Sequence, residues 1–195
     1  MEYREIAVEN LLLDPLNPRH EVVEGQSAVI AALLDDKGAP QLLRLAEDIA
    51  KHGPSPIELA LVVPDGNLFI VVEGNRRVAA IKLLKNPGLA DRSKIKNLIY
   101  ELSKRSIAID YLTCMVAESR DEARRWIELR HNGSQQGVGI IGWSPEMQVR
   151  FTGLYSGQRG RALRLTDALE AAYENDVELL QLIKAGRPQM VMPTP

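Results

Sequence analysis

The feature that most constrains the fold is an apolar run that stops at a glycine and resumes with helical spacing. Residues 68–72 are five consecutive apolar side chains, three of them β-branched, which predicts a strand covered on both faces. Beyond Gly74 the apolar residues recur at intervals of about three until Pro87, as on one face of a helix. The stretch therefore predicts a buried strand, a tight turn and a helix, with Asn75 as the cap of the helix.

Two arginines occupy the first turn of this predicted helix, where a positive charge is disfavoured. The helix dipole and the free backbone N–H groups at a helix N-terminus attract anions, and they penalise a cation by up to about 1 kcal/mol. A guanidinium group matches phosphate oxygens with two parallel hydrogen bonds. Arg76 and Arg77 are therefore candidate phosphate ligands. The alternative is that both arginines form ion pairs with Glu73 or with other surface acids.

The flanking residues predict a small mixed sheet with helices. Asp65-Gly66 is a strong turn signal, so residues 57–63 and the central strand are expected to form a β-hairpin. Further strands are predicted over residues 4–13 and 106–116, and further helices over 22–34, 40–52 and 121–131. The expected fold class is α+β: a β-hairpin feeds a strand-Gly-Arg-Arg-helix unit, and a helical C-terminal segment follows.

Domain boundaries are expected after a loop with three glycines, residues 132–139. Ser144 begins a new helical pattern with a cap and a proline. We therefore expect a first domain over residues 1–142, a helical annex over 143–187 and a flexible tail over 188–195.

Composition excludes several classes of protein. The chain has 195 residues and a net charge of −2, so no overall basic field attracts nucleic acid, and DNA contact would depend on local basic patches. Residues 91–105 carry a net of three positive charges, which indicates either such a patch or a solvated helix face. Cys114 is the single cysteine, and no apolar run is long enough to span a membrane. A cytoplasmic protein is the expectation.

Three short segments, in this order and spacing, resemble the ParB/sulfiredoxin superfamily. Asn17-Pro18-Arg19 looks like the N-terminal box of its partition proteins, which holds a proline and an arginine. Residues 74–80 look like the central Gly-Glu-Arg-Arg-x-Arg-Ala box. Residues 128–132, followed by Trp143 to Glu146, approximate the later Glu-Asn-x-Gln-Arg box and its continuation. In that family the boxes surround a nucleotide.

The resemblance implies a nucleoside triphosphate, CTP or ATP, bound with Mg²⁺, and a nucleotide-dependent switch or NTPase in a DNA-associated prokaryotic process. Homodimerisation is left open. The residues implied to bind the nucleotide are Arg19, Glu73, Gly74, Asn75, Arg76 and Arg77. The residues implied as catalytic, near the terminal phosphate, are Glu128, His131 and Asn132, with Asn132 also implied as a metal ligand. For His131, the alternative is a group that compensates the helix dipole.

The departures from the family pattern leave other functions open. Asn75 replaces the glutamate of the central box and Ala79 replaces its third arginine. No cysteine stands beside Gly74, so the sulfinic acid reduction of sulfiredoxin is not expected. The alternatives are a ParB-like DNA nuclease, a small-molecule kinase of the serine type with Glu21 or Glu24 as its base, and a non-enzymatic adaptor.

Overall fold

The computed structural model describes residues 1–35, 37–90, 95–156, 168–169 and 171–173, and it divides the chain into two compact units. The first unit is Met1–Asn132 and the second is Gly133–Pro195. Arg92 and Lys94 of the predicted basic segment, most of the predicted annex 143–187 and the whole predicted tail 188–195 lie outside the described residues.

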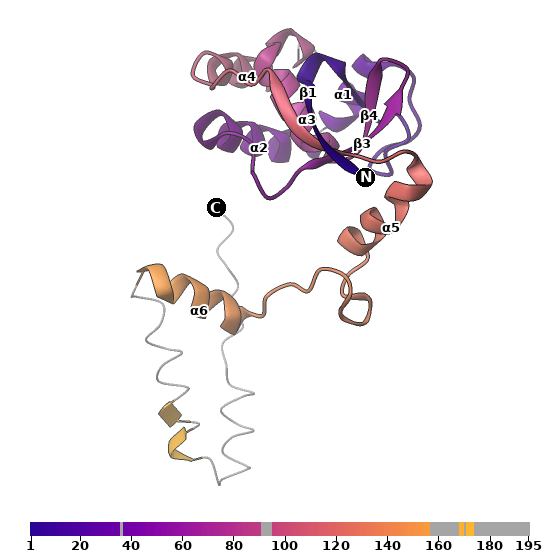
Figure 1. The fold of residues 1–195 in the computed structure, drawn as a ribbon. Coiled ribbons are helices and arrows are strands. Elements are labelled where there is room, and N and C mark those ends of the chain that lie inside the picture. Colours follow the sequence, from indigo (N-terminus) through magenta and orange to yellow (C-terminus); the bar gives the residue numbers. More distant parts are fainter. Residues whose placement is uncertain (36, 91–94, 157–167, 170, 174–195) are drawn as a thin grey trace. The chain divides into compact units, whose positions relative to one another are not determined.

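The first unit is built on one mixed sheet of five strands (Figure 1). The strands are β1 (Glu2–Ala7), β2 (Leu11–Leu13), β3 (Ala60–Asp65), β4 (Leu68–Glu73) and β5 (Tyr111–Val116). Their order is β1-β5-β3-β4-β2, with β2 parallel to β4, β3 parallel to β5, and the other two pairs antiparallel. The hairpin of β3 and β4 is confirmed, and Gly66 in its turn has a positive φ of 59°.

The prediction of a single first strand over residues 4–13 is wrong. The short 3₁₀ helix η1 (Val8–Asn10) interrupts it, so that β1 and β2 lie at opposite edges of the sheet. Apolar residues on both sides of the break concealed it, because Val8 within η1 is itself buried. Because the chain crosses from one edge of the sheet to the other between β1 and β2, the end of β2 lies next to the end of β4.

Six α-helices are described, with two further 3₁₀ turns. In the first unit they are α1 (Gln26–Leu33), α2 (Gly38–His52), α3 (Asn75–Lys85), η2 (Pro87–Ala90), α4 (Lys96–Ser103) and α5 (Arg120–His131); in the second they are η3 (Gln135–Gly137) and α6 (Pro145–Ser156). The first helix is shorter than the predicted 22–34. It begins only after Gly25, whose φ of 82° is not helical.

Alternate residues of the inner strands face two different apolar clusters. Val62 of β3 and Val71 of β4 pack into the main core with helices α1 to α4, whereas their neighbours Val63 and Val72 pack into a smaller cluster with α5. A strand with apolar residues on both faces is therefore confirmed for β4. The prediction that this strand is fully buried is wrong, since Val71 is its only buried residue.

These elements confirm an α+β fold in which β4, Gly74 and α3 follow one another as predicted. In the part of the chain that the structure describes, none of the helices combines the length and the hydropathy that crossing a bilayer requires.

Candidate functional site

A pocket of about 680 Å³ lies where β2 and β4 end and α3 begins. Both strands are parallel and run toward it, so the loops that follow them, at Asp14 and Gly74, meet at one edge of the sheet. Ligands of α/β sheets commonly bind outside the carboxyl ends of strands. Six arginines line the pocket against three carboxylates: Arg19, Arg76, Arg77, Arg120, Arg124 and Arg130 face Asp14, Glu73 and Glu128.

The turn into α3 is made by Gly74, and two features of the turn favour glycine at this position. Its φ is 91°, in the left-handed region, and a Cβ on it would lie 3.3 Å from the Cα of Ala60. Because Gly74 is the N-cap residue and has no side chain, no side chain caps α3. The N–H groups of Arg77 and Val78 donate to the carbonyl oxygen of Gly74 (both 3.0 Å), so those of Asn75 and Arg76 are the ones left without an acceptor among the described residues.

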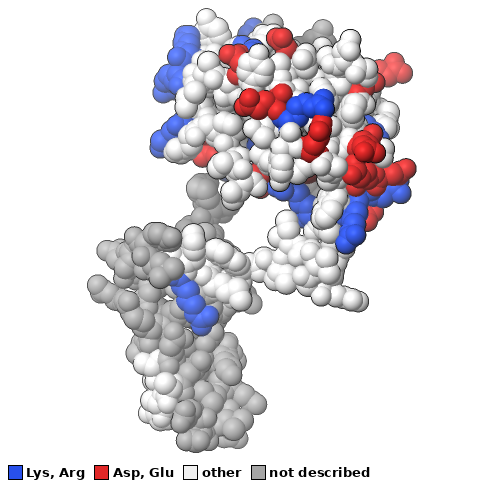
Figure 2. Space-filling model, in the orientation of Figure 1, with Lys and Arg blue, Asp and Glu red and all other residues white. Residues whose placement is uncertain are grey.

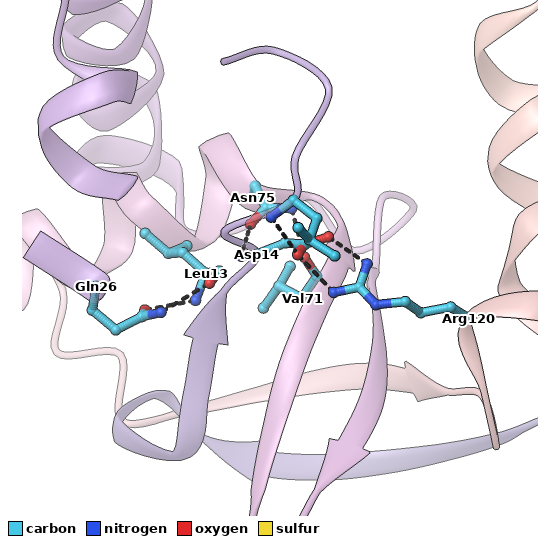
Figure 3. A network of polar contacts seen from close by, with 7 residues as sticks. Leu13, Asp14, Gln26, Val71, Asn75 and Arg120 are labelled. Atoms are coloured by element: carbon cyan, nitrogen blue, oxygen red, sulfur yellow. Dashed lines mark hydrogen bonds and ion pairs between the residues drawn. The ribbon is translucent and has the colours of Figure 1, made fainter. Parts of the chain in front are cut away.

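The prediction that Asn75 caps the helix is wrong. Asn75 is the first helical residue and is 4% exposed, and its side-chain amide joins two strand ends (Figure 3). Its Oδ1 accepts a hydrogen bond from the N–H of Asp14 (2.8 Å), and its Nδ2 donates one to the carbonyl oxygen of Val71 (2.6 Å). The N-cap residue is Gly74 instead, because the turn requires a positive φ at that position.

Asp14 carries a buried carboxylate that faces α5. Arg120 donates two hydrogen bonds to it, both of 2.7 Å, one to each oxygen. This hydrogen bonding raises the pKa of Arg120, against the opposing effect of its burial. The pair fixes the start of α5 to the end of β2.

A second set of charges alternates along the other side of the pocket. Arg77 binds both the carboxylate and the backbone carbonyl oxygen of Glu58, and Arg130 of α5 binds the other carboxylate oxygen of Glu58 (2.8 Å). Glu73 in turn contacts Arg130 (3.3 Å) and the Nε2 atom of His131 (2.9 Å). Here the predicted alternative of ion pairing holds, although the partner of Arg77 is Glu58 and not Glu73.

Arg76 differs from its neighbour Arg77. Neither Arg76 nor Arg19 forms an ion pair or a side-chain hydrogen bond with any residue that the structure describes, and both line the pocket. Burial lowers the pKa of Arg76, and the positive charges of Arg19 and Arg77 lower it further. Arg76 thus lies close to Arg19 and Arg77 at the N-terminus of a helix, where positive charge is already disfavoured, and it forms no ion pair with any described residue.

Some of the remaining candidate residues line the pocket and others do not. Glu128 and His131 line the pocket, and Asn132 does not; its N–H bonds the carbonyl oxygen of Glu128 at the end of α5. Glu21 and Glu24, named for the kinase alternative, are not among the lining residues either. Within the described residues no group of three or more His, Cys, Asp or Glu side chains is arranged to hold a metal ion.

The basic segment 91–105 is partly neutralised where it is described. Lys104 forms an ion pair with Glu101 (2.8 Å) and lies 4.5 Å from the centre of the Tyr100 ring. On the face of the first unit drawn in Figure 2, acidic and basic side chains are interspersed, with no single basic patch.

Three site residues escape the sequence analysis: Asp14, Glu58 and Arg120. Asp14 directly follows an apolar run, and a polar residue at the end of a strand is a signal that could have found it. Glu58 and Arg120 carry no such signal, since their partners are distant in sequence and surface charges of this kind are common.

The sequence matches no protein-family model and no curated protein. Among solved structures it is similar to the C-terminally truncated chromosome-partitioning protein ParB from Caulobacter crescentus complexed with CTP-γ-S. The two chains share 19% identity and align with a TM-score of 0.41 over 80% of this chain. The alignment spans 64% of the length of that structure. The pocket residues of this chain therefore carry the functional inference.

Proposed function

We propose that the pocket of the first unit binds a nucleoside triphosphate, CTP or ATP, with Mg²⁺. The chain would then act as a nucleotide-dependent switch or NTPase in a DNA-associated process of prokaryotes. The observation that carries this proposal is Arg76, a partly buried cation without an ionic partner among the described residues.

A bound polyphosphate would relieve the electrostatic cost of this arrangement. Each phosphate oxygen that accepts a hydrogen bond from Arg76 or Arg19 compensates a charge that forms no ion pair with a described residue. The first turn of α3 adds backbone N–H groups and the positive end of the helix dipole. The helix dipole stabilises a phosphate at this position, and this gain offsets the penalty that the dipole imposes on the arginines.

The pocket also suits the rest of a nucleotide. Its volume of about 680 Å³ lies within the range of small-molecule sites. Leu16, Leu45 and Ile127 supply apolar lining, and a nucleobase needs such a surface in addition to the polyphosphate contacts. These features favour a nucleotide over a bare inorganic anion.

The residues present fit a magnesium ion that the phosphates hold for the greater part. Mg²⁺ in nucleotide sites commonly has one or two carboxylates and several waters beside the phosphates, so a dedicated cluster of acids is not needed. Glu73 and Glu128 are the lining carboxylates on the side of His131. The ion would neutralise charge on the polyphosphate; Asn132, which the resemblance implies as a metal ligand, does not line the pocket.

The test is a calorimetric titration of the whole chain with CTP, ATP, GTP and UTP, each with and without Mg²⁺. Binding of CTP or ATP is expected. Arg76→Ala should weaken it roughly 10- to 150-fold, because a charge-assisted hydrogen bond worth about 1.5 to 3 kcal/mol is lost.

Arg44→Ala is the matched control, since Arg44 is exposed on α2 and does not line the pocket. It removes the same charge from the chain and should leave the affinity unchanged. Absence of binding by all four triphosphates, or equal losses in the two variants, would reject the proposal. Release of inorganic phosphate from the bound nucleotide then separates an NTPase from a switch that does not hydrolyse it.

A further inference from the structure

We infer that Asp14, Asn75 and Arg120, here called the Asp14 latch, position Arg19 for phosphate binding. The inference rests on the proposed function. None of the three side chains needs to touch the phosphate for this role, because they act through the backbone of the loop that carries Arg19.

Asn75 is the centre of the latch, and both ends of its amide are used (Figure 3). The oxygen accepts from the N–H of Asp14 and the nitrogen donates to the carbonyl oxygen of Val71. A carboxylate could do only the first of these, since it has no hydrogen to donate. It would also add a second negative charge beside Asp14, which is 3% exposed. The latch therefore requires an amide at this position.

The carboxylate of Asp14 extends the latch to α5. Both of its oxygens accept from Arg120, and Oδ1 also accepts the N–H of Leu16 at 2.9 Å. The direction of the chain after β2 is thus fixed by a planar fork that fits one orientation of the carboxylate.

From Asp14 the hydrogen bonds continue to Arg19. The N–H of Asn17 donates to the carbonyl oxygen of Asp14 (3.2 Å), and the side chain of Asn17, which is buried, accepts from the N–H of Arg19 (3.0 Å). Two successive turns stabilised by side chains therefore connect the latch to the backbone of Arg19.

This chain of bonds matters because Arg19 and Arg76 repel each other. The charge of Arg19 lowers the pKa of Arg76, so the two guanidinium groups lie close enough to interact in the absence of an anion. A loop free to move would separate them, and a ligand would have to bring them together again. The latch holds them in place beforehand, which is preorganisation of an anion site.

The test is a double-mutant cycle with Arg120→Lys and Arg19→Ala, followed by titration with CTP–Mg²⁺ and ATP–Mg²⁺. Lysine keeps the positive charge in the pocket but cannot form the fork. Arg120→Lys alone should weaken binding between roughly 3-fold and 30-fold. In the Arg19→Ala background it should have little further effect, because the group that it positions is already absent. A role in general stability alone predicts the same fold-change in both backgrounds.

Arg125→Lys is the control, since Arg125 is exposed on α5, the helix that also carries Arg120, and does not line the pocket. It should leave affinity unchanged. Asn75→Ala provides a second route to the same cycle, because it removes both hydrogen bonds of the amide without adding a charge, and its effect should show the same dependence on Arg19. Equal fold-changes in both backgrounds, with binding by the unaltered chain intact, would overturn the latch and leave the proposed function standing. Failure of the unaltered chain to bind either nucleotide would overturn both.

Discussion

Two groups of arginines line one pocket and differ in what balances their charge. Arg77, Arg120, Arg124 and Arg130 each bind a carboxylate. Arg19 and Arg76 have no such partner among the residues that the structure describes. The difference separates arginines that form ion pairs from arginines that we propose as phosphate ligands, although the sequence presents them all alike.

The contrast is sharpest between neighbours on one helix turn. Successive helical residues point about 100° apart, so one face of the first turn of α3 meets the chain before β3 and the next meets the loop after β2. On the first side Arg77 forms an ion pair with Glu58, and on the second Arg76 is repelled by the positive charge of Arg19. Adjacent, chemically identical residues can therefore have opposite effects on the stability of the empty protein.

The largest effect on stability is expected for the acid of the Asp14 latch. Asp14→Ala removes both acceptors of Arg120 and the acceptor of the Leu16 N–H from a buried position. The free energy of unfolding should fall by about 2 to 4 kcal/mol, as urea denaturation would measure. Arg19→Ala, on the same loop, should change it by no more than about 0.5 kcal/mol, because Arg19 is exposed and has no ionic partner among the described residues. Similar losses in both would show that the fork is not structural.

A smaller effect is expected from replacing the two neighbours by methionine, which retains apolar packing. Arg77→Met removes an ion pair and a hydrogen bond to the backbone from a side chain that is 17% exposed. It should lower the free energy of unfolding by about 1 to 2 kcal/mol, since Glu58 itself is partly solvated.

Arg76→Met should be neutral or stabilising, within about 0.5 kcal/mol, because it removes a cation from the first helical turn and relieves repulsion by Arg19 and Arg77. Thermal unfolding of both variants without nucleotide, at low ionic strength, checks the pair. If Arg76→Met proves the more harmful, Arg76 has a structural role and the division of the arginines is wrong.

The location of the candidate site could be predicted from the sequence, whereas the ion-pair partners of its residues could not. The strand, the Gly74 turn and the helix follow from apolar spacing and from the conformational freedom of glycine, both of which act locally. Eight of the nine residues named for the site line one pocket; Asn132 is the one that does not. Only Arg76 and Arg77 follow from local pattern; the other residues were named through the resemblance, and their roles remain predictions.

The ion pairs were out of reach for a physical reason. Glu58 lies 19 residues from Arg77 and 72 from Arg130, and Asp14 lies 106 from Arg120. Such pairing depends on the order of strands in the sheet, and that order was not predicted, since residues 4–13 were predicted as one strand. The role of Asn75 was missed for the same reason: its partner Asp14 comes from a strand whose place beside β4 is a property of the whole sheet.

The smallest effect is expected from Glu58, the acid that keeps Arg77 and Arg130 occupied. Glu58→Gln retains an oxygen that can accept from Arg77 but removes the charge, so both arginines add to the positive potential of the pocket. The affinity for CTP–Mg²⁺ or ATP–Mg²⁺ should rise about 2- to 5-fold at low salt and lose most of this gain at high salt, where screening is strong. Asp48→Asn is the matched control, because it removes a charge from an exposed pair on α2 and should not alter affinity. Calorimetry at two ionic strengths decides the matter: a fall in affinity on Glu58→Gln would mean that the occupied arginines must stay fixed for the free ones to bind, so the two groups would not be separable.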